Sequence, residues 1–165
     1  MASLDPLRSA RAPWVYLVVL DRGERPETVL AGPPGFVVRT IDGRRGRSKR
    51  GLLNELARAL EFPAGSGRNW DAVEEMLADL EWLPAKGYLL VVTHADLLLV
   101  EHPDDYETFI DIVKSVAKEW ATPGRGASAR AAVAFHVCLV VDRERADTRA
   151  DWRAPRLSVK RKATR

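Results

Sequence analysis

Four carboxylates have the spacing in this chain that most clearly suggests a function. They are Asp71, Glu74, Glu75 and Asp79. A helix turns by about 100° per residue, so this spacing gathers them on one face of a helix over about 69–82, together with Ala78 and Trp82. The opposite face is apolar and holds Trp70, Val73, Met76, Leu77 and Leu80. The segment therefore predicts an amphipathic helix with one anionic face.

This anionic face has three interpretations. It could be an ordinary solvated face, because charged outer faces of amphipathic helices are common. It could bind a hard cation, but successive carboxylates on one helix rarely surround a metal without ligands from elsewhere. It could also bind a cationic partner. No Lys or Arg lies between Asn69 and Trp82 to neutralise the face, and adjacent carboxylates repel one another, which favours the cationic partner.

Histidine and cysteine show no pattern that indicates catalysis or metal binding. His94, His102 and His136 lack the spacing of zinc ligands. Cys138 is the only cysteine and lies in the apolar run 131–141, where we expect a buried, unreactive thiol. No Ser, His and Asp stand in an order that indicates a triad, although triad members can be far apart in sequence. We therefore expect no enzymatic activity, no metal and no cofactor.

The turn before the anionic helix resembles a phosphate-binding loop only superficially. It contains Gly65, Ser66 and Gly67, followed by Arg68. It lacks the spacing and the Lys-Ser/Thr ending of a P-loop, and the carboxylates that follow would repel phosphate. We do not expect an anion site here.

Charge is distributed unevenly along the chain. Residues 1–50 carry ten basic and five acidic side chains, residues 51–142 seven and fifteen, and residues 143–165 nine and three. An acidic centre repels nucleic acid and attracts cationic surfaces. The basic loop 44–50 and the basic tail could contact RNA or DNA, but weakly and without specificity. We favour a solvated loop and a solubilising tail.

Apolar runs predict strands at 14–20, 36–41, 88–93 and 131–141. The last run is almost continuously apolar, as expected for a strand covered on both faces. Three segments predict no regular structure. They are a loose start at 1–13, a long loop rich in Gly and Pro at 21–35, and a disordered basic tail at 143–165.

Helices are predicted between these strands. Leu52, Leu53, Leu56 and Leu60 recur at helical spacing, and a third helix begins at Pro103. Asn69 can cap the anionic helix, and Asp71 in its first turn suits the helix dipole. Strands that alternate with helices predict an α/β fold with a mainly parallel sheet.

The compartment is predicted from what the sequence lacks. The apolar run 14–20 is too short to span a membrane, and Asp21 and Arg22 follow it at once, so we expect no secretory signal. One cysteine allows no intrachain disulfide, which fits a reducing compartment. We expect a cytoplasmic protein without membrane contact.

Residues 60–73, Leu60-Glu61-Phe62-Pro63-Ala64-Gly65-Ser66-Gly67-Arg68-Asn69-Trp70-Asp71-Ala72-Val73, resemble the signature of the barstar family. In that family a Leu/Phe-Pro turn, a Gly-x-Asn and an Asp-Ala-Leu-like helix start recur at this spacing. The resemblance implies a barstar-like domain at 36–142 with a small, mainly parallel three-stranded sheet. Residues 1–35 would form an extension whose strand at 14–20 could join that sheet.

The resemblance also implies a function. Barstar-like proteins inhibit barnase-type ribonucleases inside the producing cell, and their second helix and the preceding loop enter the nuclease cleft. Carboxylates there replace the RNA phosphates, and this pair is itself a reference case for charge-steered association. The implied partner-binding residues in this chain are Gly65, Ser66, Gly67, Asn69, Asp71, Glu74, Glu75 and Asp79.

Some of these positions depart from the family pattern. Glu75 stands where the family has its dominant aspartate, which keeps the charge one methylene further out. Gly65 and Glu74 stand where barstar has a tyrosine and a tryptophan, and Ser115 stands where a further interface glutamate is expected. The acidic surface is therefore kept and aromatic anchors are lost. This favours a basic ribonuclease or toxin other than barnase.

Two other functions stay open at this point. The chain could be a barstar-fold binding or regulatory module that does not inhibit a nuclease. It could also be a nucleic-acid-associated protein that acts through its basic tail, which includes Lys160, Arg161 and Lys162.

Overall fold

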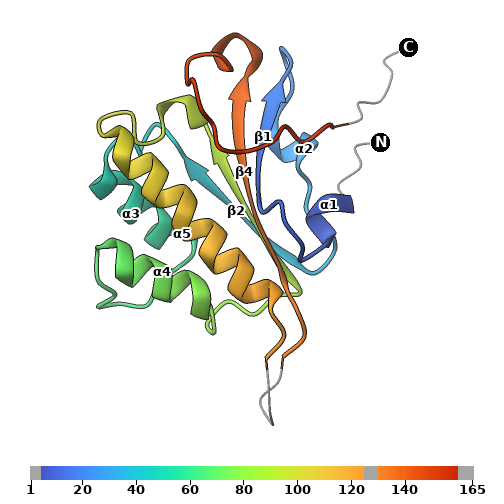
Figure 1. Cartoon of the computed structure of the whole chain (residues 1–165), viewed down its shortest axis with the longest axis vertical. Helices are drawn as coiled ribbons and strands as arrows, with labels where there is room; N and C mark the ends of the chain where they lie inside the picture. Colours follow the sequence, from blue (N-terminus) through green and yellow to red (C-terminus); the bar gives the residue numbers. More distant parts are fainter. Residues whose placement is uncertain (1–4, 125–129, 160–165) are drawn as a thin grey trace.

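A single parallel sheet forms the centre of the computed structural model, which describes residues 5–124 and 130–159. Its four strands lie in the order β1-β4-β3-β2 (Figure 1). The strands are β1 (Val15–Leu20), β4 (Ala134–Asp142), β3 (Gly87–Thr93) and β2 (Phe36–Asp42). The predicted α/β fold with a parallel sheet is confirmed. The N-terminal strand β1, which was expected as a possible addition to three strands, does join the sheet.

The two central strands are buried on both faces, which explains their apolar sequences. Every residue from Tyr88 to Val92 is buried, and so is every residue from Ala134 to Val141. Pairing is parallel throughout, with Val91 of β3 opposite Thr40 of β2 and Cys138 of β4. A parallel sheet needs helical crossovers that cover its faces, and the chain supplies them.

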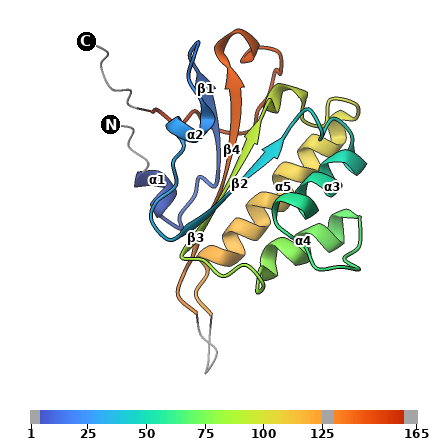
Figure 2. The same ribbon diagram turned by 180° about the vertical axis from the view of Figure 1, so that it is seen from behind.

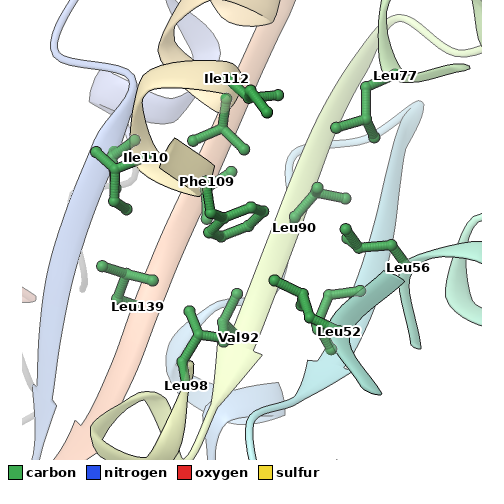
Figure 3. Close-up of a cluster of buried hydrophobic side chains, with 14 of the residues drawn as sticks. Leu52, Leu56, Leu77, Leu90, Val92, Leu98, Phe109, Ile110, Ile112 and Leu139 are labelled. Atoms are coloured by element: carbon green, nitrogen blue, oxygen red, sulfur yellow. The ribbon is translucent and has the colours of Figure 1, made fainter. Parts of the chain in front are cut away.

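Three helices cover one face of the sheet. They are α3 (Lys49–Ala59), α4 (Trp70–Asp79) and α5 (Pro103–Ala121). Figure 3 shows their leucine, isoleucine and phenylalanine side chains meeting those of β3 and β4 in one apolar cluster. The predicted helix from Pro103 is confirmed, and the side chains on its inner face are buried, among them Tyr106, Phe109 and Trp120.

The N-terminal segment covers the opposite face. Figure 2 shows α1 (Asp5–Arg8) and α2 (Pro26–Val29) there, on the side away from α3, α4 and α5. Leu7 of α1 and Leu30 just after α2 belong to a second apolar cluster with Cys138. The expectation of a loose start is therefore wrong for residues 5–13, because Leu7 is fully buried, and the predicted loop 21–35 contains a short helix.

The C-terminal segment is also ordered over its described part. It packs Trp152 beside α5, where the Tyr106 hydroxyl donates to the Trp152 carbonyl oxygen over 2.7 Å. It then runs along the outer edge of β1, where Leu17 bonds to Pro155 and Leu157. The prediction of disorder is wrong for residues 143–159, because the buried side chains of Trp152 and Leu157 and backbone hydrogen bonds to Leu17 anchor a segment whose sequence has no periodicity. Residues 160–165, with the Lys160–Lys162 cluster, lie outside the described part.

The anionic helix is shorter than predicted. It ends at Asp79, because Leu80 adopts a left-handed conformation with φ 46° and its N–H bonds to Met76. Trp82 therefore lies beyond the helix and not among its carboxylates. The Trp82 indole instead donates to the Leu60 carbonyl oxygen over 2.9 Å and packs edge-on against Phe62.

Candidate functional site

Residues of α4 and its N-cap fix where the helix starts and which way it faces. The Asn69 side chain accepts the N–H of Ala72 over 2.7 Å, so it caps the helix as predicted. Val73 and Leu77 are buried against the sheet and fix the rotation of the helix about its axis. Because these two residues point inward, the carboxylates on the opposite side point to solvent.

The predicted carboxylates do lie together on one surface. Asp71, Glu75 and Asp79 are exposed and Glu74 is half-buried. With Ala78 they line a shallow depression of about 500 Å³. The structure adds Glu119 of α5 to this depression, which the sequence reasoning missed. Only the packing of α4 beside α5 brings Glu119 there. We call these five carboxylates the acidic face.

The acidic face has no internal counter-charge. Among the described residues, no Lys, Arg or His nitrogen forms an ion pair with any of its five carboxylates. Other carboxylates of the chain do have such partners, for example Glu55 with Arg58 and Asp96 with Arg145. An unneutralised cluster attracts cations strongly at short range, and more weakly as salt increases.

The loop before α4 forms a second depression beside the acidic face. Ser66 donates its hydroxyl to the Pro63 carbonyl oxygen over 2.6 Å, and Arg68 donates to the Ser66 carbonyl oxygen over 3.0 Å. Gly65 has φ 86°, and no atom lies within 4 Å of the place a Cβ would take. A hollow of about 690 Å³ opens there, lined by Pro63, Ala64, Gly65, Ser66, Met76, Asp79, Glu81 and Trp82.

Two further expected positions can now be placed. Gly67 is tightly packed, because a Cβ there would lie 3.1 Å from the Ala72 Cβ. Ser115 is exposed on α5 but does not line the acidic depression. Glu119, one helical turn further along α5, is the residue that supplies a carboxylate there.

The histidines and the cysteine lie apart from this surface. Cys138 is buried as predicted, and its burial raises the thiol pKa to about 12. His136 is buried on the same strand, with its Nε2 2.6 Å from the Ser9 carbonyl oxygen. Within residues 5–124 and 130–159, no group of three or more His, Cys, Asp or Glu side chains could hold a metal ion.

The basic loop 44–50 is partly engaged within the protein. Arg44 binds the Asp42 carboxylate over 3.0 Å, and Lys49 Nζ lies 5.4 Å from the centre of the Trp70 ring. Arg45, Arg47 and Arg50 are exposed. Of these basic side chains, Lys49 therefore lies against Trp70, the first residue of α4.

Comparison with known proteins supplies the family. The family model described as Barstar (barnase inhibitor) matches residues 36–140, while curated proteins give no match. Among the described residues, none of the helices combines the length and apolar character that a membrane crossing requires. The matched span runs from β2 into β4, includes the acidic helix and its preceding loop, and covers more than half of the chain. The chain belongs to the barstar family.

Proposed function

We propose that this protein is an intracellular inhibitor of a barnase-like ribonuclease or a related basic toxin. In this proposal α4 and the preceding loop block the active site of the partner, and the inhibitor performs no chemistry of its own. The observation that carries the proposal is the acidic face, whose carboxylates have no counter-charge among the described residues. A nuclease that binds RNA phosphates presents the complementary cationic cleft.

The proposal gives each residue of the site a role. Asp71 and Glu75 are the central anionic contacts, and Glu74 and Asp79 extend them along α4. Glu119 adds a carboxylate from the neighbouring helix. The turn Gly65–Gly67 sets the approach of the partner.

Preorganisation favours this mode of binding. The carboxylates project from a helix that Asn69 caps and that Val73 and Leu77 anchor, so little backbone entropy is lost when a partner binds. Charged contacts of this kind also speed the encounter between the two proteins, and this acceleration is lost at high salt. The cytoplasm of the producing cell is where such an inhibitor would be needed.

The test is a pull-down from secreted and cytosolic proteins of the producing organism, followed by a ribonuclease assay on what binds. We expect a basic nuclease whose activity falls in proportion to the inhibitor added, reaching zero at a fixed molar ratio. Capture of non-nuclease proteins alone, with no nuclease inhibited, would contradict inhibition. It would instead favour a barstar-fold binding or regulatory module.

The third interpretation, nucleic-acid binding through the tail, has less support. Arg145 pairs with Asp96, and Arg153 pairs with Glu107 and Asp111. Arg149 lies 3.9 Å over the Tyr106 ring and donates to the Leu98 carbonyl oxygen. These arginines hold the tail to the protein and are less available to phosphate.

A further inference from the structure

Two hollows lie side by side at the C-terminal end of α4 and share two carboxylates. One is the hollow beside the Gly65 loop, which we call the loop hollow. The other has a volume of about 380 Å³ and is lined by Asp79, Leu80, Glu81, Pro84, Ala85, Tyr88, Trp120 and Arg130; we call it the Trp120 hollow. Asp79 and Glu81 line both.

An arginine of the chain itself, Arg130, forms part of the wall of the Trp120 hollow. The Arg130 guanidinium carbon lies 3.9 Å from the centre of the Trp120 ring, which is stacking distance for a cation–π contact. Arg130 lines this hollow together with Asp79 and Glu81, although no ion pair in the described part of the chain joins it to either carboxylate. A tryptophan face beside two carboxylates therefore already packs against an arginine side chain in this protein.

The loop hollow has the same elements without the arginine. Trp82 supplies the aromatic wall, Pro63 and Met76 supply further apolar surface, and Asp79 and Glu81 supply the carboxylates. None of the residues that line it is an Arg or a Lys. Its apolar walls suit the methylene stem of a long cationic side chain, and its carboxylates suit the charged end.

The backbone adds to the preference for a cation. α4 ends at Asp79, so the hollow lies at the negative end of the helix dipole, where cations are stabilised. Gly65 leaves its side of the hollow open, since no atom lies within 4 Å of its Cβ position. A side chain from outside can therefore enter between the Gly65 loop and α4.

We propose that the loop hollow receives an arginine side chain of the protein partner. The inference rests on the proposed function, because it assigns one contact within that interface. Arginine fits better than lysine because its planar guanidinium both stacks on an aromatic ring and bridges two carboxylates. The loop hollow then replaces the aromatic anchor that Gly65 lacks, and it selects partners that have an arginine at this place.

The test uses N-acetyl-arginine amide as the probe and the Trp82 indole N–H signal in a ¹⁵N–¹H NMR spectrum as the readout. We expect the signal to shift saturably with the probe, and to shift less with N-acetyl-lysine amide at equal concentration. Glu81→Gln should weaken the apparent affinity for the arginine probe by about tenfold, since it removes one charge-assisted hydrogen bond. Glu101→Gln, an exposed site that lines neither hollow, is the matched control and should change nothing.

A second variant separates this inference from the proposed function. The double variant Asp71→Asn, Glu75→Gln should keep the Trp82 response, because neither residue lines the loop hollow. An unmoved Trp82 signal, or equal responses in wild type and Glu81→Gln, would overturn the inference while leaving nuclease inhibition unaffected. Failure to find an inhibited nuclease would overturn the proposed function and leave the titration as it stands.

Discussion

Two groups of carboxylates in this protein have opposite surroundings. At the junction of β2 and α3, the Glu55 side chain is 3% exposed and accepts hydrogen bonds from Arg58 and from the Asp42 backbone N–H. Asp42 in turn accepts from Arg44 over 3.0 Å. On α4, Asp71, Glu75 and Asp79 are exposed and Glu74 is half-buried, and none of the four has an ion-pair partner among the described residues.

The difference separates carboxylates that the fold itself neutralises from carboxylates that it leaves unpaired. A buried carboxylate is costly unless it is paired and hydrogen-bonded, so Glu55 has its arginine within the chain. The Arg58 hydrogen bond lowers the pKa of Glu55, and the Arg44 hydrogen bond lowers the pKa of Asp42. Exposed carboxylates need no such partner for folding, and the α4 group is consequently free to pair with another protein.

The largest expected effect is on partner binding. The double variant Asp71→Asn, Glu75→Gln should weaken binding of the captured nuclease by about 1000-fold, if each residue contributes about 2 kcal/mol as interface hot spots do. Isothermal titration calorimetry or inhibition kinetics would measure it. Glu101→Gln with Glu144→Gln removes the same charge from exposed positions elsewhere and should leave affinity within about threefold. Unchanged affinity in the α4 variant would refute the interfacial role of this face.

The next effect is on stability and concerns the other group. Glu55→Ala should lower the free energy of unfolding by about 2 kcal/mol, because it removes a buried hydrogen-bonded carboxylate and leaves the Asp42 N–H without its acceptor. Urea denaturation would measure the change. Glu75→Ala removes an exposed glutamate that also lies within a helix. This comparison variant should lower the free energy of unfolding by less than about 0.5 kcal/mol. Equal losses at the two sites would remove the distinction between the groups.

A smaller effect concerns acid. The folded-state pKa values of Asp42 and Glu55 lie below their ordinary values of 3.8 and 4.5, so the unfolded chain binds more protons as pH falls through this range. Their stabilisation is fully present above about pH 5 and is lost as pH falls through the folded pKa values. Unfolding free energies from pH 7 to pH 3 should therefore decline less steeply in Glu55→Gln than in wild type. Parallel curves for the two proteins would contradict the assignment.

The smallest effect has the opposite sign. Asp79→Asn should raise the free energy of unfolding by about 0.5 kcal/mol. It removes a negative charge from the C-terminal end of α4, where the helix dipole disfavours one, and it removes the repulsion between Asp79 and Glu75 one turn earlier. The same variant should weaken partner binding. Thermal denaturation and the binding assay together test this trade of stability for function. A loss of stability would show that Asp79 makes a structural contact.

Local patterns in the sequence were sufficient to predict most strands and helices of this protein. Apolar runs identified the four strands of the sheet, helical spacing identified α3 and α4, Pro103 marked the start of α5, and the Asn69 cap gave the start of the acidic helix. These features depend on residues that are close together in the sequence, so the order of residue types is enough to reveal them. The barstar-like signature at 60–73 has the same local character.

Tertiary structure alone decided the rest. Glu119 lies 40 or more positions from the α4 carboxylates and joins them only because α5 packs against α4. Trp152 anchors an aperiodic tail through a hydrogen bond to Tyr106, 46 positions away. Trp82 leaves the acidic face because Leu80 turns left-handed and the indole finds the Leu60 carbonyl. Each outcome depends on a partner distant in sequence, and periodicity carries no information about such partners.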